Sequence, residues 1–85
     1  MNNRLEEFKR RMAFERKVGA RLSSSLGNGL TATISRGVTL FTTGPGKKVL
    51  VEIDHAARIA SLHSSVPYPV ENLLASNSFF VERLS

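Results

Sequence analysis

Basic residues recur at helical spacing along the N-terminal segment of this 85-residue chain. If residues 3–26 form a helix that turns about 100° per residue, one face gathers these cations and holds a single acid, Glu6. The cations, called the basic ridge below, are Lys9, Arg10, Arg16, Lys17 and Arg21. Such a helix can lie along a phosphate backbone, where each contact releases counterions and adds salt-dependent affinity. The pattern therefore predicts nucleic-acid binding; the alternative is a solvated helix surface in a basic protein.

Two more lysines, Lys47 and Lys48, follow the turn sequence Gly44-Pro45-Gly46. The segment is not a phosphate-binding loop of the form G-x-x-x-x-G-K-[ST], because position 41 is Phe, Lys48 replaces the final Ser or Thr, and a strand is expected to follow. A hairpin turn is predicted instead. Its lysines either extend the basic ridge or protect a sheet edge against pairing.

No residues are predicted to have catalytic, cofactor-binding or metal-ligating roles. Asp54 and His55 are neighbours in sequence, which does not make their side chains face each other. If residues 55–64 are helical, His55 and His63 lie about 12 Å apart along the axis, too far to share a metal ion. The chain has no cysteine and no nucleophile-elbow motif. A domain of this size also has little room for a pocket of about 300 Å³ or more, so we expect no enzyme.

Composition predicts one small domain, residues 1–85, with a basic surface. Twelve Lys and Arg face seven Asp and Glu, which gives a net charge of +5 and favours polyanionic partners. The longest aliphatic run in the expected sheet, residues 49–51, is far too short for a membrane span, and the N-terminus lacks a signal-like apolar segment. We expect a soluble protein, and the lack of cysteine fits a reducing cytoplasm.

The apolar positions of the predicted helix fall into two sets. One set is Leu5, Phe8 and Met12, and the other is Phe14, Val18 and Leu22, displaced by roughly a third of a turn. Arg11 and Glu15 lie between the two sets at a spacing of four residues. They either pair along the rim of a broad buried face or mark a bend of the helix.

Three strands are predicted after the helix, over residues 30–35, 38–43 and 48–53. Turn residues separate them, and residues 38–43 carry apolar side chains on both faces, which favours the middle position. In the third strand, alternation places Val49, Val51 and Ile53 on one face and Leu50 with Glu52 on the other. The three strands predict an antiparallel meander covered by the N-terminal helix.

The C-terminal third allows two interpretations. A helix over residues 55–64, capped by Asp54, is favoured by the alanines, and a fourth strand over residues 58–64 is the alternative. A last helix follows Pro69 over residues 70–77, and the tail at residues 78–84 is expected to pack on the core. The predicted fold class is α+β: a long N-terminal helix on a three-stranded meander, followed by one or two short helices.

The order helix, three or four strands, helix, together with the hairpin sequence GPGKKVLVEI, resembles a double-stranded-RNA-binding domain. That family carries a lysine-rich patch at the start of its last helix, where this chain has Pro69-Val70-Glu71-Asn72. The resemblance therefore supplies no site residues.

The leading hypothesis is a non-enzymatic protein whose basic ridge contacts nucleic-acid phosphates. No aromatic stacking platform is predicted, because only Tyr68 is expected to be exposed and the phenylalanines all have core positions: Phe8, Phe14, Phe41, Phe79 and Phe80. The rival is a small adaptor or inhibitor, of the type carried by phages and mobile elements, that binds an acidic protein surface. A homodimer is a further expectation, through one of two apolar sets: Leu5, Phe8 and Met12, or Phe79 and Phe80.

Overall fold

The computed structural model describes residues 3–26, 29–43 and 48–84, with the side chains of residues 3, 25 and 26 left aside. The helices and strands, in chain order, are α1 Asn3–Leu26, β1 Leu30–Ser35, β2 Val38–Thr43, β3 Lys48–Asp54, β4 Ile59–Leu62, α2 Tyr68–Ser76 and β5 Phe80–Arg83. The α+β class, the long N-terminal helix and the three predicted strands are confirmed. Of the one or two short C-terminal helices predicted, one is described, α2, and it lies between β4 and β5.

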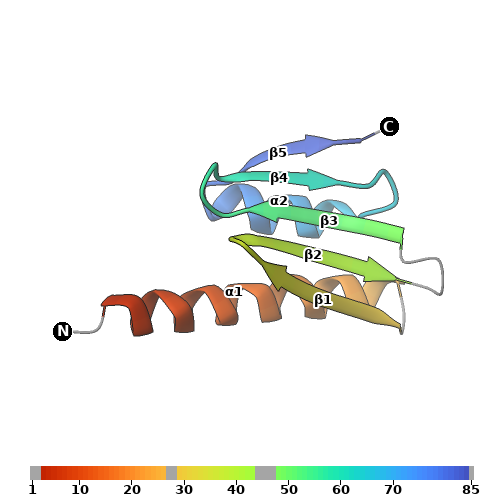
Figure 1. Ribbon diagram of the computed structural model, residues 1–85. Helices are drawn as coiled ribbons and strands as arrows, with labels where there is room; N and C mark the ends of the chain where they lie inside the picture. Colours follow the sequence, from red (N-terminus) through yellow and green to blue (C-terminus); the bar gives the residue numbers. More distant parts are fainter. Residues whose placement is uncertain (1–2, 27–28, 44–47, 85) are drawn as a thin grey trace.

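The sheet has five strands in the order β1-β2-β3-β4-β5, so the predicted three-stranded meander is only its first part (Figure 1). The first four strands are antiparallel, and β5 pairs with β4 in parallel, with Ile59 opposite Phe80 and Leu62 opposite Arg83. A parallel neighbour needs a crossover connection, which α2 provides. Both helices lie on the same face of the sheet, which gives two layers.

The helix predicted over residues 55–64 is wrong, and the alternative strand is close to what forms. Asp54 Oδ1 accepts hydrogen bonds from the backbone N–H groups of Ala56 (3.1 Å) and Ala57 (3.0 Å), which closes a turn. The turn ends at Arg58, whose φ is +59°. Ala60 and Leu62 then point into the core at a spacing of two residues and are fully buried. Pairing with β3 outweighs the helix preference of the alanines.

The core lies between the sheet and the two helices. Its members from the helices are Val18, Leu22, Val70 and Leu74, and its main members from the sheet are Phe41, Leu50, Val51, Ile53, Ala60 and Leu62. The predicted alternation in β3 fails because of a bulge. Phe41 pairs with Val51 but Thr42 pairs with Val49, so Leu50 is the extra residue. Leu50 and Val51 are therefore both buried, whereas Val49 is exposed.

The tail packs on the core through one of its two phenylalanines. Phe79 is buried, and Phe80 on the edge strand β5 is 66% exposed. Phe79 is held by the end of α2, where its N–H donates to the carbonyl of Leu74 (3.1 Å) and the N–H of Ser78 donates to that of Ala75 (3.1 Å). This hydrogen-bond pattern is the Schellman motif, and Leu74 and Phe79 are both in the core, as the motif favours.

Ser78 occupies the position of the Schellman motif that glycine prefers, and its φ is +69°. We predict that Ser78→Gly raises the free energy of unfolding by about 1 kcal/mol, because glycine adopts this conformation without steric cost. Urea unfolding checks it. Ala75→Gly, inside α2, is the control and should lower stability by about 0.5–1 kcal/mol. A loss of stability in Ser78→Gly would contradict the prediction.

Candidate functional site

The first turns of α1 extend past the sheet (Figure 1). A helix of 24 residues is about 36 Å long, whereas the seven residues of β3 span only about 23 Å. All side chains from Arg4 to Arg10 are exposed, and burial begins at Arg11. Residues 4–10 therefore present their side chains to solvent all round.

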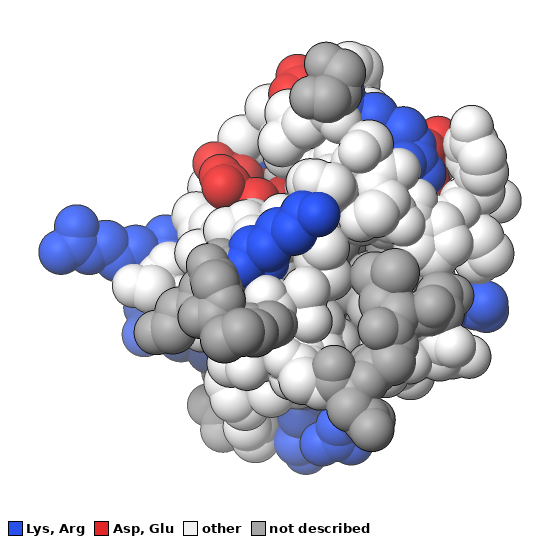
Figure 2. Space-filling model, turned by 90° about the vertical axis from the view of Figure 1, so that its right-hand side faces the viewer, with Lys and Arg blue, Asp and Glu red and all other residues white. Residues whose placement is uncertain are grey.

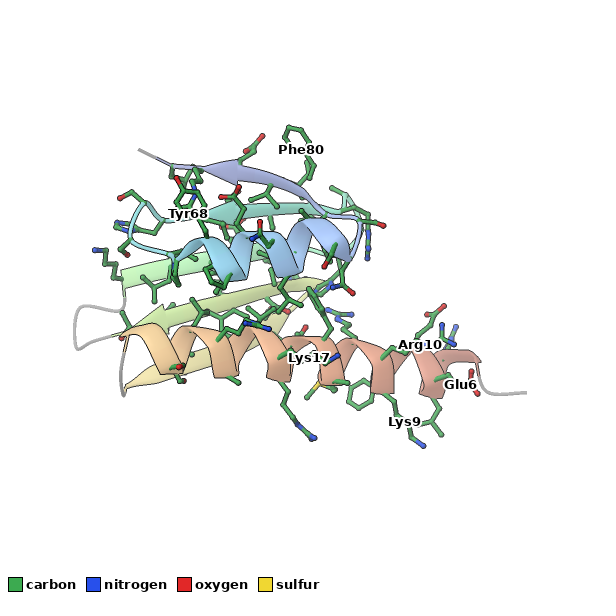
Figure 3. The ribbon with its side chains drawn as sticks, turned by 180° about the vertical axis from the view of Figure 1, so that it is seen from behind. Glu6, Lys9, Arg10, Lys17, Tyr68 and Phe80 are labelled. Carbon is green, nitrogen blue, oxygen red and sulfur yellow. The ribbon has the colours of Figure 1, made fainter. Side chains whose placement is uncertain are left out.

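The structure brings the five residues of the basic ridge together on the outer side of α1, and all five are exposed. Of these, Lys9, Arg10 and Lys17 project from the helix without pointing into the sheet (Figure 3). Arg10 lies 4.0 Å from Glu6, in a pair so exposed that it contributes little to stability. Among the described residues, the other four ridge cations have no carboxylate within 4.0 Å.

Of the two lysines predicted to extend the ridge, the structure describes one, and it stands apart from the ridge. Lys47 lies outside the described residues, and Lys48 is exposed at the start of β3. That end of the sheet is the one at which α1 ends, so Lys48 is remote from Lys9 and Arg10 (Figure 1). On the face seen in Figure 2, basic side chains form separate groups instead of one continuous patch. The candidate surface is therefore α1 itself.

A buried polar network ties the middle of α1 to the sheet. Glu15, only 6% exposed, accepts a hydrogen bond from the hydroxyl of Thr39 on β2 (2.7 Å). The same carboxylate oxygen lies 3.1 Å from His55 Nε2 and 3.5 Å from Arg11 Nε. Arg11 and Glu15 thus pair at the rim of the buried face, as one of the two predicted alternatives has it.

His55 is held with its Nε2 proton toward this network. Because the Thr39 hydroxyl donates to Glu15, it can only accept from His55 Nε2, at 3.0 Å. Burial lowers the pKa of His55 below its usual value of about 6.5, the charge of Arg11 lowers it further, and contact with Glu15 partly opposes both. The imidazole is therefore neutral at pH 7.

This network has the groups of a nucleophile–base–acid set, but its geometry is structural. The side chain of Thr39 is completely buried, so no substrate can approach its hydroxyl in this structure. The acid that His55 contacts is Glu15 and not its sequence neighbour Asp54, whose carboxylate closes the turn. Within the described residues, no three His, Asp or Glu side chains gather closely enough to hold a metal ion.

A cavity of about 530 Å³ lies between the first turns of α1, the turn at residues 55–58 and the end of α2. Four of its lining residues are arginines, and we call it the arginine cavity: Arg4, Arg10, Arg11 and Arg58. The length of the chain predicted little room for a pocket of about 300 Å³ or more, and the structure has an open one of this size. Two helices of unequal length leave open space where the sheet ends.

A second, smaller hollow of about 360 Å³ runs between α1 and the edge strand β1, and we call it the edge groove. Its apolar lining is Met12, Leu30, Ala32, Ile34 and Phe41. Neither hollow could be predicted from the sequence, because both depend on how α1 sits against the sheet. An acid at Glu15 among apolar helix positions was the one signal that a buried polar contact would form.

No protein-family model, curated protein or solved structure matches the chain. In the part of the chain that the structure describes, neither helix combines the length and the apolar character needed to cross a membrane. Function is therefore argued from the geometry of this chain alone.

The lowered pKa of His55 predicts a pH-dependent stability. Below about pH 6.5 the unfolded chain binds a proton at this imidazole that the folded chain resists, so stability falls as pH decreases from 7.5 to 5.5. The slope from one such group stays below about 1.4 kcal/mol per pH unit. Urea unfolding at several pH values measures it.

Two variants assign this slope. His55→Gln should remove most of it, and His63→Gln, whose wild-type imidazole accepts from the backbone N–H of Ser65, should retain it. An unchanged slope in His55→Gln would show that the network is not its source.

Proposed function

We propose that this protein is a non-enzymatic nucleic-acid-binding protein that contacts phosphates through the basic ridge of α1. One observation carries the proposal: five cations are exposed on the outer side of one helix, and the only carboxylate within 4.0 Å of any of them, among the described residues, is that of Glu6. The ridge residues are Lys9, Arg10, Arg16, Lys17 and Arg21. Lys47 and Lys48 are proposed as additional contacts, and of these the structure describes Lys48, which is exposed at the start of β3.

Two further features support phosphate binding. The net charge of +5 attracts polyanions over the whole surface. On the opposite side of α1, the side chains of Val18, Leu22 and Glu15 are buried. This burial fixes the rotation of the helix about its axis, so the ridge faces solvent. The absence of cysteine from the chain is compatible with action in a reducing cytoplasm.

A second candidate, an adaptor or inhibitor that binds an acidic protein, is favoured by the edge groove. Among the described strands, the neighbouring β1 pairs with β2 alone; it carries no charge or proline and exposes Ile34. Such an edge can accept an extended segment of a partner. Leu5 and Phe8 are also exposed, as a docking or homodimer patch requires. In the second predicted set, Phe79 is buried, so Phe80 alone is exposed for such a contact. Binding through this apolar groove would respond little to salt.

Charge reversal on the ridge tests the leading proposal. We predict that Arg16→Glu and Lys17→Glu each weaken binding to a fluorescent oligonucleotide and lower the salt dependence by about one ion, and that the double variant does not bind at physiological salt. Fluorescence polarisation measures both quantities. The matched control is Arg36→Glu, which makes the same change of charge in the exposed turn between β1 and β2.

The control variant should bind within about twofold of the wild-type protein, because it lies off the ridge. Wild-type affinity in the double ridge variant, or equal losses in the ridge and control variants, would contradict the proposal.

A further inference from the structure

We infer that the arginine cavity binds one unpaired nucleotide of a single-stranded nucleic acid, with its base on Phe8 and its phosphate among Arg4, Arg10 and Arg58. The inference rests on the proposed function and names the form of nucleic acid that the protein prefers. It follows from the size, charge and aromatic lining of the cavity.

The cavity has the size of a small-ligand site. Its volume of about 530 Å³ falls in the range of about 300–1,000 Å³ in which such sites lie. Exposed residues of α1 form its outer wall, so a ligand can enter from solvent. His55 and Phe79, whose rings meet edge to face with centres 5.9 Å apart, form part of its inner wall.

The charge of the cavity is positive and largely uncompensated. Among the described residues, Arg4 and Arg58 have no carboxylate within 4.0 Å, and Arg10 has only the exposed Glu6. Arg11 is engaged by Glu15, and Glu7 is the one acid in the lining. Guanidinium groups bind phosphate through paired N–H donors, so the cavity selects an anion.

Arg58 is fixed in position before any ligand arrives. Its guanidinium donates to the backbone carbonyl of Asn77 at the end of α2 and lies 4.0 Å from the centre of the Phe79 ring. Within the described residues its other N–H groups have no hydrogen-bond partner and can donate to a ligand. The positive field of this group reaches the inner wall, since the charges of Arg11 and Arg58 both lower the pKa of His55.

The aromatic lining offers one ring for stacking. Phe14 and Phe79 stack on each other, with ring centres 5.5 Å apart, and are committed to the core. Phe8 is 59% exposed and lines the same cavity, which corrects the prediction that it is buried. Aromatic rings accept any base by stacking, but only if the base is unpaired.

The cavity is continuous with the basic ridge. Arg10 belongs to both, so a strand whose phosphates follow the ridge passes the opening of the cavity. A duplex can use the ridge but cannot place a base against Phe8. The geometry therefore points to single strands as the preferred ligand.

The test is a fluorescence-polarisation titration at 50 mM and 150 mM salt with a single-stranded 12-mer and a blunt duplex of the same sequence, each as DNA and as RNA. Wild-type protein should bind the single strand about tenfold more tightly than the duplex. Phe8→Ala should lower single-strand affinity about tenfold and leave duplex affinity within twofold, because stacking is lost and the ridge is intact. Arg4→Glu should also lower the affinity for the single strand.

Phe80→Ala is the matched control, because it removes an equally exposed ring from β5, on the opposite side of the molecule from α1 (Figure 3). Circular dichroism confirms folding; both phenylalanines are exposed, so neither change opens the core. Equal affinity for the single strand and the duplex, with no effect of Phe8→Ala, would overturn the role of the cavity and leave the ridge proposal standing. If wild-type protein binds neither the single strand nor the duplex, the cavity proposal and the ridge proposal are both overturned.

Discussion

Glu15 is a carboxylate removed from water in the middle of α1, and the position of that helix depends on the side chains that compensate for it. An unpaired buried charge costs several kcal/mol, so Glu15 is tolerated here only with the Thr39 hydroxyl, the His55 imidazole and the Arg11 guanidinium around it. These partners come from α1, β2 and the turn after β3. Their fixed geometry sets the rotation of α1 about its axis and its position along the sheet.

Two surfaces follow from that position. With Glu15, Val18 and Leu22 facing the sheet, the ridge cations must face outward. Because the helix is longer than the strands, its first turns have no sheet beneath them, and residues that would otherwise be buried line an open cavity. Phe8 illustrates this: its spacing along the helix is that of a core residue, but the core ends before its position is reached. The basic ridge and the arginine cavity are therefore two consequences of one overhang.

Local signals in the sequence predicted much of the fold. The bounds of α1, the first three strands and the exposure of the ridge all follow from periodicity and turn residues within short windows. Three features could not be obtained this way. The carboxylate of Asp54 can cap a helix or close a turn, and the choice depends on whether Ala60 and Leu62 find partners on β3. The strand β5 exists only through parallel pairing with β4, and the bulge at Leu50 is visible only in the register with β2.

The candidate site likewise has one part that was predicted from the sequence and one part that was not. The ridge lies on one helix and could be identified from spacing alone. The contact of Glu15 with His55 joins residues far apart in the chain, and Arg58 enters the cavity only because the residues before it form a turn. Such long-range placement has no signal in a single sequence. The basic ridge was therefore predictable from the sequence, whereas the arginine cavity was not.

The most direct test of phosphate binding by α1 is the affinity of wild-type protein for a single-stranded oligonucleotide as a function of salt concentration. If the five ridge cations contact phosphates, log K should fall linearly with log salt, with a slope of roughly −3.5. A slope near zero, or no saturable binding at low salt, would contradict the claim that α1 is a phosphate-binding surface and would direct attention to the edge groove and a protein partner.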